Sequence, residues 1–451
     1  MPSGPLASPA VQIISRLFSR IVGPAAVMAA GTMGAGAAAS LILAGAWFRY
    51  ELLWVIPLIL PLFVISVDSA SRIGLLNPET GMFSHIREHI HPGVAWLIFA
   101  INIPVHLLIG MGQMSVMTSA LMSLFGFYPP EAGANADYLA NYHGAEIALS
   151  LLIAVFIVWL LASRGYQRMQ KIMSALLLVM FCGFMVVAVT SLQQIGDILA
   201  GFVPAIPPDL PVPGKNAVRI SSNSIIAIVG SALAPAALLG IPYMCADNLK
   251  GVPDLVAELR NSVVNLGVVF GGYSIFVLVA GGFALYPLPH HAEIDTVHEA
   301  GKVLVNAFPA GLEFLGPFFF SAGLMIAALT TFVVVVQVIC YFWLDMFGRN
   351  WHDAEDNKSF KRLVVVWVVT PAVLAPFWDF PALLKILLLM GFNTIVIPLV
   401  IVVVLVLVNK PQLMGRHTAS RPRNLILLSA LVLSAWLMLE KLPDYIDLIV
   451  G

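Results

Sequence analysis

Long apolar runs recur along the whole of this chain of 451 residues. Each run holds about 20 residues, the length that a helix needs to cross the hydrocarbon core of a bilayer. A segment inside lipid must satisfy its own backbone hydrogen bonds, so it forms a helix or part of a closed barrel. Charged residues make up only 10% of the chain, against about 25% in soluble proteins. The sequence therefore predicts an all-α polytopic membrane protein.

Hydropathy predicts about eleven membrane-spanning helices. They lie near residues 23–46, 51–73, 94–124, 145–163, 171–196, 221–244, 262–286, 313–343, 362–378, 381–408 and 424–441. Most of the 23 Lys and Arg residues fall on the side of the N-terminus, which the positive-inside rule assigns to the cytoplasm. We therefore expect a cytoplasmic tail over residues 1–22 and a C-terminus outside. The expected location is a bacterial inner (plasma) membrane, with the lipid bilayer as partner and the protein as a monomer.

Charge and cysteine content exclude several other classes of function. The formal net charge is −1, which gives no basis for binding nucleic acid, and the three cysteines share no metal-ligand spacing. The sequence contains no catalytic motif, so we expect no enzyme activity, no catalytic residue and no resident cofactor. A small solute is the expected binding partner.

Two stretches of small residues occupy matching places in the two halves of the chain. AAGTMGAGAAAS at 29–40 lies in the first predicted span, and GSALAPAALLG at 230–240 lies in the sixth. Pro235 lacks a backbone N–H and clashes with the preceding helical turn. Each stretch alone is more typical of a proline kink and of close helix packing through small residues than of a helix break. Their matching positions favour broken helices at a solute site between inverted repeats.

This arrangement predicts a single transmembrane domain over residues 23–441. Five spans form repeat one (23–196), five inverted spans form repeat two (221–408), and an extra helix follows at 424–441.

Several motifs in this order resemble the NRAMP (natural resistance-associated macrophage protein) family of divalent-metal transporters. GPAAVMAAGTMGAGAAASLILAGAWFRYELLW at 23–54 resembles the family's first helix, and SRIGLL at 71–76 resembles the end of its second. RGYQRMQKIM at 164–173, the proline at 235 and VIPLVIVVVLVLVNKPQLMG at 396–415 match later motifs. The resemblance covers nearly the whole chain. It implies a LeuT-type fold with five plus five inverted helices, breaks in helices 1 and 6, and secondary transport by alternating access.

The sequence departs from this family at the positions where the family binds metal. The family's DPGN motif aligns with Gly34–Ala37, and its MPH motif aligns with Ala234–Ala236. The acidic position that the family uses for proton movement aligns with Gln113. The chain is thus expected to belong to a divergent branch that lacks the family's metal ligands.

The expected substrate site follows from the two predicted breaks and from the tenth span. Half-helix N-termini favour an anion, so we expect a small anion such as bicarbonate or a short carboxylate. One alternative is a divalent metal ion, Mg²⁺ or Mn²⁺, as the resemblance implies. A second is a sensor on the same fold that transports nothing. The expected substrate-binding residues are Thr32, Gly34, Ala35, Gly36, Ala37, Ala234, Pro235, Ala236, Ala237 and Asn393.

A few other polar residues lie within predicted spans. The adjacent hydroxyls of Thr330 and Thr331 resemble the sodium-coupling position of LeuT-type symporters, although such hydroxyls often bond to their own helix. Na⁺ is therefore a candidate coupling ion. Asp68 and Arg72 lie four residues apart on one helix face, which is typical of a local ion pair and also compatible with an inner gate.

Overall fold

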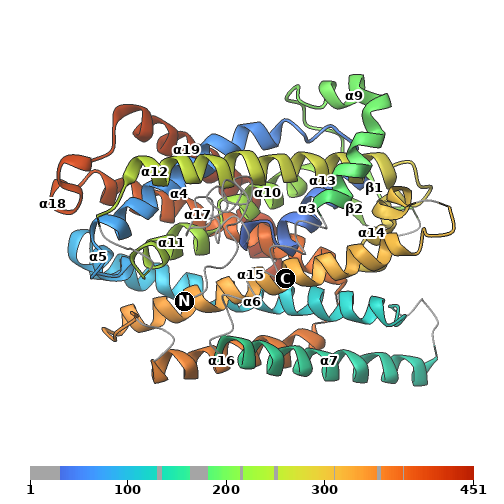
Figure 1. Cartoon of the computed structure of the whole chain (residues 1–451), viewed down its shortest axis with the longest axis horizontal. Coiled ribbons are helices and arrows are strands. Elements are labelled where there is room, and N and C mark those ends of the chain that lie inside the picture. The colour runs from blue at the N-terminus through green and yellow to red at the C-terminus, as the bar shows by residue number, and fades with distance from the viewer. Residues whose placement is uncertain are drawn as a thin grey trace, which may run out of the picture.

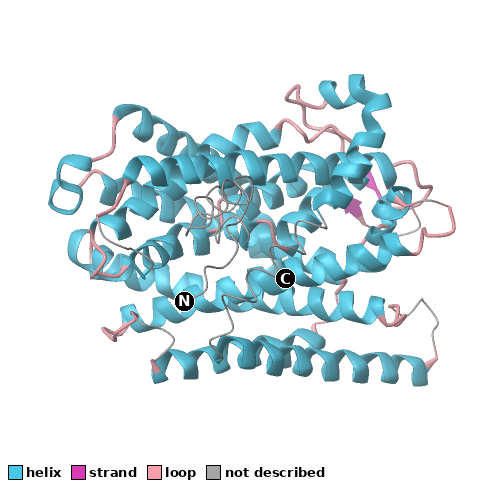
Figure 2. Cartoon of the chain, in the orientation of Figure 1, coloured by secondary structure: helices cyan, strands magenta, loops and turns pink. Residues whose placement is uncertain are grey.

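The computed structural model describes residues 31–129, 135–162, 181–213, 217–247, 252–308, 310–352, 357–378 and 380–450. These residues form a bundle of long helices and one two-stranded sheet (Figures 1 and 2). Among them, ten helices are long and apolar enough to cross a membrane, and one shorter apolar helix covers Ala35–Phe48. The predicted all-helical membrane architecture is thus confirmed.

The elements follow one another along the chain in the order that the hydropathy pattern predicts. The main helices are α3 (Ala35–Phe48), α4 (Val55–Leu76), α6 (Pro92–Leu124), α7 (Ala136–Ala162), α10 (Ser221–Ala232), α11 (Pro235–Asp247), α13 (Phe270–Ala284), α15 (Leu315–Met346), α16 (Lys358–Leu374), α17 (Ala382–Val408) and α19 (Arg421–Val450). A further apolar span covers Phe181–Ala200. The short helices are α5 (Met82–His89), α9 (Ile195–Ala200), α12 (Leu255–Ser262), α14 (Val297–Gly301) and α18 (Pro411–Met414).

Irregular helical turns and one small sheet complete the fold. Strands β1 (Leu210–Pro211) and β2 (Val218–Arg219) pair antiparallel, with Leu210 opposite Arg219. The turns are η1 (Ser191–Gln194), η2 (Val263–Val269), η3 (His291–Glu293), η4 (Lys302–Ala307), η5 (Ala375–Phe377) and η6 (Gly415–His417). Of these, η2 is π-helical and joins α12 to α13, so these three elements form one continuous span over Leu255–Ala284.

Both predicted helix breaks are present. Residues 31 and 32 are helical, the backbone turns at Met33 and Gly34, and α3 then begins at Ala35. In the second half, α10 ends at Ala232 and α11 begins at Pro235. A proline at the first position of a helix loses no intrahelical hydrogen bond, so Pro235 starts a half-helix instead of kinking a continuous one.

Two helices begin before their predicted ranges, and a polar side chain caps the first of them. Asp254 accepts hydrogen bonds from the amides of Val256 and Ala257, so the seventh span begins at Leu255 and not near 262. The last helix is also longer than 424–441, because it begins at Arg421.

Residues 1–30 and 163–180 lie outside the described residues. The predicted tail, the start of the first span and the 164–173 motif fall within these two ranges.

Close helix contacts hold the bundle together where glycine leaves room for a neighbouring backbone. A Cβ atom at Gly45 on α3 would lie 2.4 Å from the carbonyl oxygen of Leu278 on α13. A Cβ atom at Gly74 on α4 would lie 2.0 Å from the carbonyl oxygen of Pro242 on α11. Membrane helices associate through such small residues because lipid gives no hydrophobic drive between helices.

Candidate functional site

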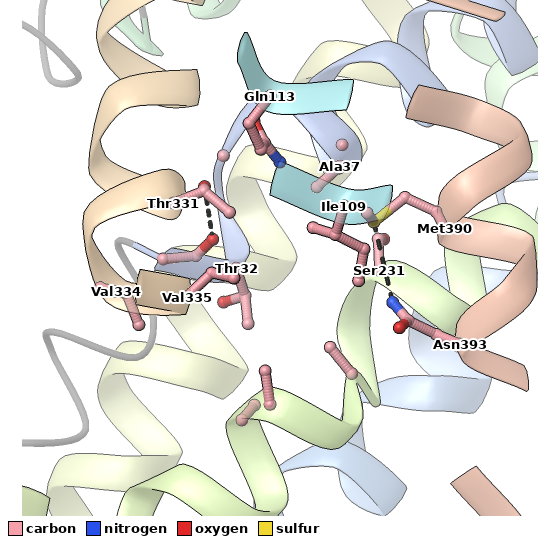
Figure 3. Close-up of a pocket in the computed structure, with 16 residues that line it drawn as sticks. Thr32, Ala37, Ile109, Gln113, Ser231, Thr331, Val334, Val335, Met390 and Asn393 are labelled. Carbon is pink, nitrogen blue, oxygen red and sulfur yellow. Dashed lines mark hydrogen bonds between the residues drawn. The ribbon is translucent and has the colours of Figure 1, made fainter. Parts of the chain in front are cut away.

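A cavity of about 50 Å³ lies where the first and sixth spans are broken. Three further helices close it, namely α6, α15 and α17. Figure 3 shows the side chains facing this space from different helices. The cavity is lined by Gly31, Thr32, Gly34, Gly36, Ala37, Ile109, Gln113, Ser231, Ala234, Ala236, Ala237, Thr331, Val334, Val335, Met390 and Asn393.

Most of the predicted substrate-binding residues line this cavity, and two do not. Ala35 and Pro235 are each the first residue of a half-helix, and both are buried but absent from the cavity wall. On a helix, neighbouring side chains point about 100° apart, so not every residue of a short motif faces the same space. A role of these two residues in substrate binding stays a prediction.

Thr331 ties α15 to the broken first span. Its hydroxyl lies 2.7 Å from the carbonyl oxygen of Gly31 and 3.0 Å from that of Ala327. A Cβ atom at Gly34 would lie only 1.5 Å from the Thr331 Oγ1 atom. The absence of a side chain at Gly34 is therefore what lets the broken segment lie against α15.

Thr330, the other predicted sodium ligand, does not line the cavity. Its hydroxyl donates to the carbonyl oxygen of Ala327, 2.9 Å away on its own helix. This is the ordinary backbone bonding of a threonine within a membrane helix. Only Thr331 faces the central space, and a sodium site at these two hydroxyls stays a prediction.

Two side chains of α17 meet at the opposite wall of the cavity. The Asn393 amide Nδ2 donates to the carbonyl oxygen of Gly230 at 3.1 Å and lies 3.9 Å from the Met390 sulfur. The Asn393 Oδ1 atom is buried and has no hydrogen-bond partner in the described structure. Sequence reasoning missed Met390, although its position three residues before Asn393 places both on one helix face.

Gln113 enters the cavity from α6. It is fully buried, and neither its Nε2 nor its Oε1 atom has a hydrogen-bond partner among the described residues. A buried polar group left unpaired costs about 1–3 kcal/mol. Unpaired amide atoms on Gln113 and Asn393, facing one small cavity, indicate that it receives a polar guest.

The cavity wall carries no formal charge. None of its 16 lining residues is acidic or basic. The N-termini of two half-helices lie there, because α3 begins at Ala35 and α11 begins at Pro235, and such helix ends carry partial positive charge. A bound solute would thus interact with helix dipoles, with the amide groups of Gln113 and Asn393 and with the Met390 thioether, and with no charged side chain of the wall.

The predicted pair of Asp68 and Arg72 exists but does not line the cavity. Arg72 Nε lies 2.9 Å from Asp68 Oδ2, and Arg423 Nη1 of α19 lies 2.5 Å from the same oxygen. The fully buried carboxylate therefore joins α4 to the extra helix. The sequence could not indicate Arg423, because that contact spans more than 350 positions. A gating role for the pair stays a prediction.

A second buried carboxylate, Asp345 near the end of α15, holds the short helix α5. Its Oδ2 atom accepts from the Phe83 amide at 2.8 Å and from the Tyr243 hydroxyl at 2.5 Å. Its Oδ1 atom accepts from the Ser84 hydroxyl at 2.5 Å. Since Tyr243 belongs to α11, one carboxylate ties α5, α15 and the second half-helix together. No sequence pattern indicated this cluster.

Acid should loosen this part of the protein. Burial, aided by the nearby His89, lowers the pKa of His85 on α5 from 6.5 to about 4, so the folded protein keeps this ring neutral. The unfolded chain takes up the proton first, and the free energy of unfolding should fall by about 3 kcal/mol as pH drops from 6.5 toward 4. Thermal melts at pH 7.5 and pH 5 measure this effect. Between the two pH values, the melting temperature should fall less for His85→Gln than for His89→Gln. Equal falls in the two variants would show that His85 is not the residue responsible.

The sequence model of a family described as natural resistance-associated macrophage protein-like matches residues 25–442. The chain belongs to this Nramp family. A divalent metal cation transporter MntH of Yersinia enterocolitica is 23% identical over 347 residues, covering 74% of this chain and 76% of that relative.

Solved structures show the same fold at low sequence identity. The Eremococcus coleocola manganese transporter, in complex with an aromatic bis-isothiourea substituted compound, matches with a TM-score of 0.73 at 15% identity, over 100% of this chain and 90% of that one. MhsT in complex with L-phenylalanine matches with a TM-score of 0.55 at 14% identity, over 91% of this chain and 96% of that one. These likenesses confirm the predicted LeuT-type fold.

Membership of the Nramp family makes the protein a membrane transporter of small solutes. The comparisons favour the divalent-metal alternative over the small anion that was the leading prediction. An anion was expected because half-helix N-termini favour negative charge and the aligned motifs retain none of the family's metal ligands. The structure places the Met390 thioether in the site, on a helix that the aligned metal-binding motifs do not include.

Proposed function

We propose that this Nramp protein carries a divalent metal cation by alternating access, with the ion held in the central cavity. The observation that supports this most directly is the set of donor atoms that α6 and α17 bring to the central cavity. The Met390 sulfur lies beside Asn393, and the Oδ1 atom of Asn393 and the Oε1 atom of Gln113 are buried without partners in the described structure. Amide oxygens and a thioether are neutral donors that bind metal cations without adding charge.

The donor types also bear on which metal is bound. Thioether sulfur is a soft ligand that suits transition metals, whereas Mg²⁺ and Ca²⁺ prefer oxygen alone. We therefore propose a divalent transition metal before Mg²⁺. Within that class we propose Mn²⁺ because of the likeness to the manganese transporter, since Mn²⁺ itself suits oxygen ligands. The similar proteins reported above, a divalent metal cation transporter and a manganese transporter, agree with this class of substrate.

The ion would keep part of its hydration shell. A bare divalent cation is costly to place in a membrane interior that lacks carboxylates, and the cavity wall contains none. A cavity needs about 10–15 Å³ to hold one water molecule. The central cavity, at about 50 Å³, therefore has room for an ion with a few water molecules. Backbone carbonyls at the breaks would supply further oxygen contacts.

A small anion, bicarbonate or a short carboxylate, is the second candidate. The observation that favours it is the uncharged wall combined with the two half-helix N-termini that begin at the cavity. Coupling to Na⁺ through Thr331 belongs to this second candidate. We further propose a bacterial inner membrane as the location, with the N-terminus inside, the C-terminus outside and the monomer as the working unit.

Transport into proteoliposomes separates these candidates. Vesicles loaded with a metal-quenched dye should show saturable quenching when Mn²⁺ is added outside, and protein-free vesicles should not. A parallel assay follows bicarbonate uptake through internal pH, with and without Na⁺. Bicarbonate uptake without Mn²⁺ uptake would reverse the order of the candidates, and no flux of either solute would favour the sensor alternative.

Replacing Met390 with Leu should lower the apparent affinity for Mn²⁺ about tenfold. Leucine keeps the volume and the apolar character of the side chain but removes the sulfur donor, so the loss should appear in metal binding and not in folding. The matched control is Met117→Leu, because Met117 is buried in α6 and does not line the cavity. Calorimetric titration of Mn²⁺ measures both. An unchanged affinity in Met390→Leu would remove the thioether from the metal site.

A further inference from the structure

A second cavity, of about 480 Å³, lies between the end of α15 and the start of α16. Its wall is formed by Trp343, Leu344, Phe347, Arg349, Ser359, Arg362 and Leu363. None of these residues belongs to the central cavity. The positive-inside distribution places this end of the molecule at the cytoplasmic face.

The cavity combines positive charge with hydrogen-bond donors. Arg349 and Arg362 both line it and no acidic residue does. No ion pair of either guanidinium occurs within the described part of the chain. The Trp343 indole Nε1 atom is buried and without a hydrogen-bond partner there, and Ser359 lies in the first turn of α16. Two guanidinium groups with neutral donors beside them are suited to a phosphate group.

Aromatic and aliphatic surfaces lie beside these cations. The ring centroids of Trp343 and Phe347 lie 5.2 Å apart in a stacked arrangement, and half of the Phe347 surface is exposed. Along α16, the exposed side chains of Val365, Val366 and Val369 continue from the cavity. Figure 1 shows α16 lying with α7 at the edge of the bundle, where a bilayer would surround it. A ligand here would meet charge at one end and an apolar helix face along its length.

We propose that this cavity binds the phosphate headgroup of an anionic phospholipid from the cytoplasmic leaflet. The guanidinium groups of Arg349 and Arg362 hold the phosphate. The Trp343 and Phe347 rings lie at the level of the interface, where aromatic side chains are enriched, and the acyl chains lie along the valines of α16. Lys358 and Lys361, both in the first turns of α16, add long-range attraction to an anionic membrane surface.

Thermal melting of the purified full-length protein in detergent tests this site. Dioctanoyl-phosphatidylglycerol should raise the melting temperature in a saturable way, because a ligand that binds only the folded state stabilises it. Dioctanoyl-phosphatidylcholine should not, since its headgroup carries no net charge. Inorganic phosphate at the same concentration distinguishes the source of the phosphate group. Stabilisation by inorganic phosphate equal to that by the anionic lipid would overturn the assignment to a lipid.

The variant Arg349→Gln/Arg362→Gln should bind the anionic lipid at least about tenfold more weakly, since each basic residue near an anionic lipid contributes about fivefold in affinity. The control Arg416→Gln/Arg421→Gln removes two exposed cations from the same end of the molecule and should leave binding unchanged. Native mass spectrometry of the retained phosphatidylglycerol gives a second readout that does not depend on the melting temperature. Equal loss in both variants would reduce the effect to net charge and overturn the site.

Discussion

Replacing Gln113 with Glu should raise the affinity of the central cavity for Mn²⁺ at least about tenfold. The change adds a carboxylate to a wall that carries no charge, and two unit charges about 4 Å apart near a protein surface interact by about 4 kcal/mol. Glutamate has the shape of glutamine. Neither amide atom of Gln113 has a hydrogen-bond partner in the described structure, so the substitution breaks no contact that the structure shows. Calorimetric titration and Mn²⁺ uptake in proteoliposomes measure the gain.

The same variant separates the two candidate substrates. A carrier of bicarbonate should lose its transport in Gln113→Glu, because the new carboxylate repels the anion. The gain in Mn²⁺ affinity should also become smaller as pH falls, because the new carboxyl group takes up a proton. Gln337→Glu is the matched control, since Gln337 lies on α15 and does not line the cavity. A fall in Mn²⁺ affinity together with lost bicarbonate uptake would support the anion carrier instead.

Replacing Gly34 with Ala should reduce transport to near the background of protein-free vesicles. The added Cβ atom would lie 1.5 Å from the Thr331 hydroxyl oxygen and 2.7 Å from the Thr331 Cβ atom, so α15 and the broken segment must move apart. That movement opens the central cavity and breaks the contact of Thr331 with the Gly31 carbonyl. Overpacking of this kind commonly costs about 1–3 kcal/mol in stability. Uptake assays and thermal melts together measure both effects.

Two further variants distinguish this local clash from a general effect of alanine. Gly272→Ala on α13 is the control, because no neighbouring heavy atom lies within 4 Å of the position that a Cβ atom would take there, and transport should be unchanged. Gly34→Ala/Thr331→Gly removes the clashing atoms from the opposite helix and should restore part of the transport. Full activity in Gly34→Ala alone would show that the segment does not lie against α15 during transport.

The sequence was a good guide to the helix breaks and a poor guide to the donors at the site. Small residues around 34 and the proline at 235 predict interruptions, because both weaken a helix wherever they stand. Met390 carried no such signal: methionine is an ordinary apolar residue in a membrane helix, and only the approach of α17 to Gly36 and Gly230 brings its sulfur to the cavity.

The partners of the buried charged residues were likewise predictable from the sequence in one case and not in the others. The pairing of Asp68 with Arg72 was predictable, because residues four apart share a helix face. Arg423 and the cluster at Asp345 were not, since those contacts join segments that are distant along the chain.

By itself, then, the sequence determined the membrane class, the order of the spans and the two broken helices. Those properties depend on local composition and on a backbone that must satisfy its own hydrogen bonds in lipid. The tertiary structure alone decided which side chains face the central cavity, because helix rotation and packing set those directions. It also decided that Gly34 must lack a side chain, since that requirement comes from Thr331, a neighbour almost 300 residues away in the chain.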